Sequence, residues 1–133
     1  MPLQDAAQAV AQARRLLGLP ATAHGEAWHV RRLNAPGAYF LAHVDGRVAC
    51  IDATSGALMA SASSAHAPVA LTREAARARA GLGPDATAEL VWMPCAATLS
   101  MFDPLWAVAR GAATAFVDQR GRLWPALAAA GPG

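Results

Sequence analysis

The sequence predicts an α+β fold of two similar units, each a helix packed on an antiparallel sheet. Two Ala-rich helical patterns, each ended by Gly and Pro, begin close to residues 6 and 73. Each pattern is followed by three short apolar segments that turn residues separate. The stretch IDATSGAL, residues 51–58, also returns in similar form as VDQRGRL, residues 117–123. The sequence therefore predicts a helix-strand-strand-strand unit that is used twice.

The first unit is predicted over residues 1–62. Asp5 is a suitable N-cap for its helix, and Gly18 and Pro20 end that helix. Alternating or β-branched segments then predict strands at residues 27–33, 38–44 and 47–53.

The second unit is predicted over residues 63–133. The stretch SASSAHAP, residues 61–68, has the composition of a linker, and Thr72 is a suitable N-cap for the helix that follows. The expected strands of this unit are residues 88–95, 105–111 and 113–124. The sequence leaves open whether the two units share one sheet or pack face to face.

Three Asp-Gly pairs predict turns. Asp45–Gly46 is the preferred pair for a type I′ turn, whose central residues both have positive φ, and it predicts an antiparallel hairpin. Asp52 with Gly56, and Asp118 with Gly121, predict the turn in which the third strand of each unit ends. An Asp side chain accepts hydrogen bonds from amides two residues further on, and Gly supplies the positive φ. We therefore expect these pairs to have a structural role.

The helix LTREAARARA, followed by three strands of which the last ends in VDQRGRL, resembles the PepSY domain family. That family occurs in bacterial secreted and membrane proteins and in protease propeptides. The resemblance covers most of the chain as two degenerate copies, and the first copy has one additional residue, Ser55, in its turn. It implies a helix on an antiparallel sheet (PepSY/cystatin-like), a role in binding or inhibition, and no catalytic residues.

Composition narrows the classes of partner. The 133 residues carry a net charge of +2, and the arginines are scattered rather than gathered in a stripe, so no nucleic-acid partner is expected. Every apolar run is shorter than the roughly 20 residues of a membrane span. No secretory signal is visible at the start, which predicts a cytoplasmic protein, or a periplasmic or envelope protein if a signal was removed.

No motif predicts catalysis, a metal or a cofactor. Ser63 and Ser64 lack a nucleophile elbow, and Cys50 and Cys95 are expected to be buried small hydrophobes, although a disulfide between them remains possible. The four histidines lack the spacing of zinc ligands: His24, His29, His43 and His66. The four tryptophans are expected to pack on the sheet: Trp28, Trp92, Trp106 and Trp124.

The second unit has a longer connection between its first two strands than the first unit has. Residues 94–104, PCAATLSMFDP, correspond to residues 34–37, NAPG. The longer loop carries Leu99, Met101 and Phe102, which either cover the sheet or present an apolar surface to a partner. These three residues are the candidate partner-binding residues.

The sequence thus predicts a non-enzymatic bacterial binding module that recognises or inhibits a protein or peptide. An exposed sheet edge could also pair with a second copy and form a homodimer. The alternative is a cytosolic immunity or accessory protein of a bacterial toxin or protease system, because the LTREAA helix and the VDQRGRLW strand end also resemble some immunity families.

Overall fold

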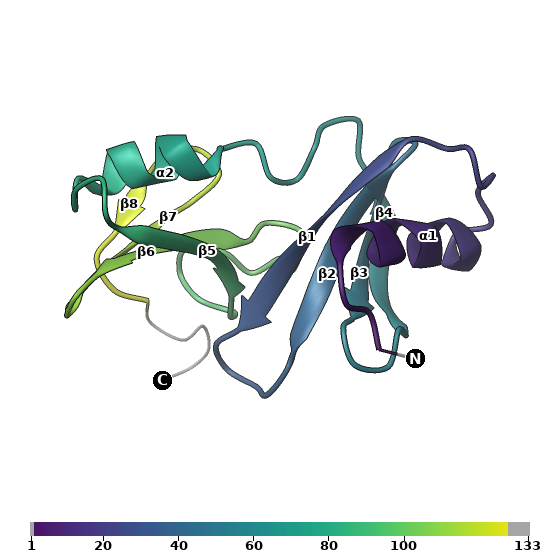
Figure 1. Cartoon of the computed structure of the whole chain (residues 1–133), viewed down its shortest axis with the longest axis horizontal. Coiled ribbons are helices and arrows are strands. Elements are labelled where there is room, and N and C mark those ends of the chain that lie inside the picture. Colours follow the sequence, from purple (N-terminus) through teal and green to yellow (C-terminus); the bar gives the residue numbers. More distant parts are fainter. Residues whose placement is uncertain (1, 128–133) are drawn as a thin grey trace. The chain divides into compact units, whose positions relative to one another are not determined.

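The computed structural model describes residues 2–127 (Figure 1). The chain divides into two compact units, residues 1–68 and residues 69–133. Within the described residues, each unit has one helix followed by four strands. The α+β class and the antiparallel pairing of the strands within each unit are therefore confirmed.

Unit 1 is an antiparallel meander with its helix on one face. Its elements are α1 (Ala6–Leu16), β1 (Gly25–Arg32), β2 (Ala38–Val44), β3 (Arg47–Asp52) and β4 (Leu58–Ser63). The strands pair in the order β4-β3-β2-β1, and α1 packs against β1, β2 and β3. β4 therefore pairs with β3 within its unit, and its other side is the edge of that sheet.

The core of unit 1 lies between α1 and the sheet. The helix buries small residues, and side chains at alternate positions of β2 and β3 meet them, as the two-residue period of a strand requires. Asp5 caps α1 by accepting a hydrogen bond from Gln8 N at 2.8 Å. The buried cluster consists of Leu3, Ala9, Val10, Ala13, Phe40, Ala42, Val44, Ala49 and Ile51.

Unit 2 has the same order of elements. They are α2 (Arg73–Ala80), β5 (Thr87–Trp92), β6 (Leu105–Arg110), β7 (Ala113–Val117) and β8 (Leu123–Trp124). The strands pair in the order β5-β6-β7-β8, and α2 packs against β5, β6 and β7. Thr72 Oγ1 caps α2 by accepting from Ala75 N, and Gly81 ends the helix with a φ of 66°.

The structure differs from the sequence prediction in the number of strands and in the position of the boundary. Unit 1 has a fourth strand, β4, beyond the three that are predicted. In unit 2 the strand predicted over residues 113–124 is divided by the turn at Asp118 and Gly121 into β7 and β8. The predicted boundary after residue 62 falls inside β4, whereas the compact units divide between Pro68 and Val69. The Ala and Ser residues of β4 look like a linker by composition, but pairing with β3 makes them a strand, because tertiary context outweighs weak local propensity.

Candidate functional site: the 93–104 loop and its anchoring turn

The three Asp-Gly pairs occupy turns that follow β2, β3 and β7. Asp45 and Gly46 have φ values of 49° and 73°, the two positive values that a type I′ turn requires. The hairpin they form joins β2 to β3, with Val44 opposite Arg47. This pair fixes the register of two buried strands of unit 1.

Asp52 ends β3 and organises the next turn of unit 1. Its Oδ1 accepts from Thr54 N at 2.9 Å and from Ser55 N at 2.8 Å, and Gly56 has a φ of 76°. The hydrogen bond from the Ser55 amide is the main reason that the pKa of the Asp52 carboxyl lies below its ordinary value. The polar groups of this carboxylate are used within its own turn.

Asp118 ends β7 and organises a turn that has more partners. Its Oδ1 accepts from Arg120 N at 2.9 Å and Arg122 N at 3.0 Å, while Oδ2 accepts from Trp124 Nε1 at 3.1 Å. Asp118 is only 1% exposed. Burial alone would raise the pKa of this carboxyl, but the hydrogen bonds from Trp124, Arg122 and Arg120 outweigh burial and lower the pKa.

The loop between β5 and β6, residues 93–104, has an ordered hydrogen-bonded shape. Cys95 and Thr98 exchange two backbone hydrogen bonds, with N···O distances of 2.9 and 3.1 Å. Ser100 continues the loop: its Oγ accepts from Phe102 N at 3.1 Å, and its carbonyl accepts from Asp103 N at 3.0 Å. These bonds form two successive turns, so the loop has a defined conformation.

The loop both covers the fold and presents an apolar surface. Cys95, Ala97 and Thr98 are buried. Leu99, by contrast, is 74% exposed, the highest value among the exposed large hydrophobic residues, and the next is Leu123 at 47%. The other two predicted residues of the site, Met101 and Phe102, are half-buried and follow Leu99 closely in the chain.

Residues next to Asp118 hold the C-terminal end of this loop. Gln119 Nε2 donates to Pro104 O at 2.9 Å, and Gln119 Oε1 accepts from Leu71 N at 3.0 Å. Arg120 lies 3.6 Å from Asp103. The pKa of the Asp103 carboxyl is nevertheless raised above its ordinary value, mainly by burial and also by the nearby Asp118 charge. The turn at Asp118 therefore connects the loop to the segment that precedes α2.

Sequence reasoning missed Gln119, Arg120 and Asp103 as parts of this site. Their pairings join segments that are distant in the sequence, and no local motif marks them. The one sequence signal for Gln119 and Arg120 is that they lie in the recurring Asp-to-Gly turn, to which the sequence analysis assigns only the ending of a strand. The loop and the turn were identified separately, and the structure brings them together.

Tryptophans of unit 2 reinforce the same region. Trp106, which is buried, donates from Nε1 to Leu71 O at 2.8 Å, and the Arg73 guanidinium lies 5.7 Å from the Trp106 ring centre. Arg122 stacks over Trp124, with its Cζ 4.3 Å from the ring centre. These aromatic rings pack and hydrogen-bond within the fold.

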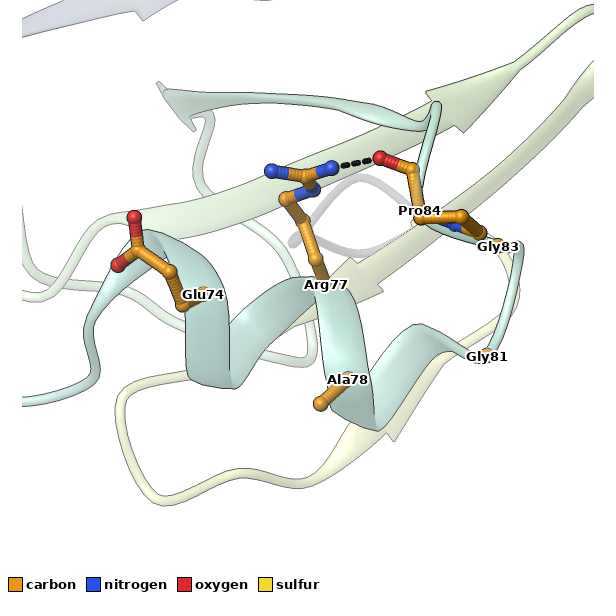
Figure 2. A pocket seen from close by; sticks show the side chains of 6 residues that line it. All are labelled: Glu74, Arg77, Ala78, Gly81, Gly83 and Pro84. Carbon is orange, nitrogen blue, oxygen red and sulfur yellow. Dashed lines mark hydrogen bonds between the residues drawn. The ribbon is translucent and has the colours of Figure 1, made fainter.

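A second feature of unit 2 is a shallow hollow of about 430 Å³ beside α2 (Figure 2). The Arg77 guanidinium donates from Nη2 to Pro84 O across it, while Glu74 lies one turn away on the helix. Its described lining has no Ser, Cys or His: Glu74, Arg77, Ala78, Gly81, Gly83 and Pro84. It offers one arginine already bonded to the backbone and no nucleophile.

Of the four histidines, His24 and His43 line one hollow of unit 1 together with Glu26 and Asp45. Among residues 2–127, no group of three or more His, Cys, Asp or Glu side chains could hold a metal ion. Cys50 and Cys95 are free and buried, and burial raises the pKa of the Cys50 thiol to about 12. Cys50 is therefore a protonated, unreactive thiol at neutral pH.

Comparisons with known proteins add no relative. No protein-family model matches the chain, and neither the curated proteins nor the solved structures gave a match. In the described part of the chain, neither helix has the length and apolar character needed to cross a membrane.

Proposed function

We propose that this chain is a non-enzymatic module that binds a protein or peptide partner through the 93–104 loop. The single observation behind this proposal is the 74% exposure of Leu99 on a loop that is otherwise hydrogen-bonded and partly buried. Met101 and Phe102, from the same loop, are half-buried and so partly accessible to a partner. A protein side chain that covers Leu99 removes apolar area from water, which favours association.

The fixed shape of the loop supports recognition. The Cys95–Thr98 bonds hold one side of Leu99, and Gln119 and Arg120 hold the residues after Phe102. A loop that is ordered before binding loses less conformational entropy when a partner covers it. This distinguishes Leu99 from a single exposed leucine on an ordinary surface, which would need no explanation.

The polar side chains of the loop have structural partners, and this supports a role without catalysis. Thr98 Oγ1 and Ser100 Oγ bond to the loop backbone, and Asp103 faces Arg120. A nucleophile or general base needs a partner that activates it and access to a substrate. The side chains here are engaged in holding the loop.

The resemblance to PepSY domains agrees with this proposal. Each unit places a helix before antiparallel strands, and the third strand of each ends in an Asp-to-Gly turn. We propose that the units are two degenerate copies of such a domain in a bacterial protein. Under this proposal the partner is a protein or peptide whose activity or location the module controls.

Affinity capture from the source organism tests the proposal with a matched pair of variants. Leu99→Ser removes the exposed loop side chain, and Leu123→Ser makes the same change at the next most exposed large hydrophobic residue. We expect recovery of a specific partner to fall at least about tenfold for Leu99→Ser and to stay unchanged for Leu123→Ser. Equal recovery of the partner with the unchanged chain and with both variants would overturn the proposal, as would the absence of any partner above background.

The identity of the captured partner also separates the proposed module from the immunity alternative. Capture of a toxin or of a protease from such a system would favour the immunity or accessory role, whereas capture of an envelope protein or peptide would favour the PepSY-like role. In both cases the loop makes the contact.

A further inference from the structure

We propose that β4 is a self-association edge at which two copies of this chain pair antiparallel about Ser61. β4 covers Leu58–Ser63 and is the edge strand of unit 1. The proposal concerns a surface in unit 1 and is independent of the loop of unit 2.

β4 lacks the features that usually protect an edge strand. Its sequence, LMASAS, contains no charged residue and no proline. Leu58, Ser61 and Ser63 are exposed. The one protective feature is an irregularity at Met59, where the register with β3 shifts between Cys50 and Ile51.

The edge of unit 2 is protected in the usual ways. β8 consists of Leu123–Trp124 alone, with an exposed Arg122 before it and Pro125 after it. Short length, charge and proline all oppose the addition of another strand. The same chain therefore protects one edge strand and leaves the other open.

The hydrogen-bond pattern identifies which groups of β4 point outward. Ser64 N donates to Gly46 O at 2.8 Å, so Gly46 and Ser64 are a hydrogen-bonded pair. Val48 lies opposite Ala62, two residues further along the ladder, and is therefore the next hydrogen-bonded pair. Because bonded pairs alternate along an antiparallel ladder, Ala60 and Ala62 direct their backbone groups to β3. The backbone N–H and C=O groups of Ser61 and Ser63 are directed to the open side.

A second copy supplies the complementary groups. With Ser61 opposite the Ser61 of the other copy, each serine donates its N–H to the carbonyl of the other, and Ala60 lies opposite Ala62. Uncharged residues along LMASAS place no like charges opposite one another. Such a pairing has two-fold symmetry and closes at two copies.

The neighbouring elements leave space for this pairing. Ser61 pairs with Ala49, whose side chain belongs to the α1-facing core, so Ser61 projects from the same face as α1. The helix packs against β1, β2 and β3, and Ser61 and Ser63 remain exposed beyond it. Small side chains let the two strands approach to ladder distance.

Light scattering and sedimentation of the full chain over a range of concentrations test the proposal. We expect a species of twice the 13.7 kDa mass, in a concentration-dependent equilibrium. Ser61→Arg places two like charges opposite each other at the symmetry axis and should raise the dissociation constant at least about tenfold. Thr54→Arg adds the same charge to an exposed turn of unit 1 and should leave the equilibrium unchanged.

Disulfide trapping tests the register. In a bonded antiparallel pair the Cα atoms are about 5.5 Å apart, within the range a disulfide spans. Ser61→Cys should therefore cross-link two copies on mild oxidation, whereas Leu58→Cys should not, because residue 58 lies opposite residue 64. The native cysteines are buried and should not interfere.

Three results would overturn this proposal. A monomer at every concentration would do so, and so would a dimer that Ser61→Arg leaves intact. The third result is a monomeric chain that captures another protein and loses that protein when Ser61 is changed to Arg. In that case β4 would pair with a strand of the other protein and not with a second copy. Unchanged melting temperatures of the variants show that each result concerns association and not folding.

Discussion

The two units end their third strands with closely similar turns, but in unit 2 a side chain of the turn, Gln119, also bonds to two segments that are distant in the sequence. Asp52 accepts hydrogen bonds from two amides of its own turn, and Asp118 accepts hydrogen bonds from two amides and from the Trp124 indole. Gln119 then extends from the second turn to Pro104 and Leu71. A local motif that ends a strand in one unit thus anchors a long loop in the other.

The helix also contacts the turn in both units, with different side chains. Gln12 of α1 donates to Gly56 O at 2.8 Å. Arg79 of α2 lies against Gly121, where a Cβ built on the glycine would be 3.3 Å from its guanidinium. The common feature is a helix side chain resting on the turn glycine, so each turn is part of the packing of its unit.

The largest expected effect of a single change is at Asp118. Asp118→Ala leaves two amides and the Trp124 indole without their acceptor in a site that is 1% exposed. We expect a loss of about 3 kcal/mol in the free energy of unfolding, against about 1 kcal/mol for Asp52→Ala. Urea denaturation of both variants measures this. Equal losses would show that the two turns are energetically equivalent.

The next effect concerns the glycine of the anchoring turn. Gly121 has a φ of 86°, which a β-branched residue adopts only with strain, and the Arg79 side chain would have to move. Gly121→Val should cost about 2 kcal/mol, within the usual range for such strain. Thermal unfolding tests this, and an unchanged melting temperature would refute the role assigned to the turn.

A smaller effect separates the anchoring of the loop from general stability. Gln119→Ala removes the bonds to Pro104 O and Leu71 N and should cost about 1 kcal/mol. It should also speed amide exchange at Phe102 and Asp103. Gln12→Ala removes one glutamine hydrogen bond from unit 1 and serves as the control. If Gln12→Ala speeds amide exchange at Phe102 and Asp103 as much as Gln119→Ala does, Gln119 is not a specific anchor of the loop.

The smallest effect is on the dependence of stability on pH. The pKa values of Asp52 and Asp118 are lowered in the folded chain. Their ionised forms therefore stabilise the fold above the ordinary carboxyl pKa of about 3.9, and this stabilisation is lost as the pH falls towards the folded-state pKa. Asp52→Asn should weaken this decline only slightly, because its site is more exposed than that of Asp118. Unfolding free energies between neutral and acidic pH check the sign, and a rise in stability on acidification that Asp118→Asn abolishes would contradict it.

Local signals predicted the elements better than the contacts between them. Asp5, Thr72 and Gly81 marked helix ends because caps act within a few residues. β4 was not counted among the strands because its Ala and Ser residues favour no structure until β3 pairs with them. The anchoring of residues 93–104 by Gln119 depends on tertiary contacts that no local pattern encodes. The exposure of Leu99 likewise follows from the folded loop and could be stated from the sequence only as one of two outcomes.

The central claim is that the loop of unit 2 is the surface that meets the partner. A photo-reactive amino acid placed at position 99, and in a second protein at position 123, tests it in living cells. Both leucines are exposed, so both probes can reach solvent. The account predicts one discrete covalent adduct from position 99 and none from position 123. Adducts of the same mass from both positions, or from position 123 alone, would contradict it.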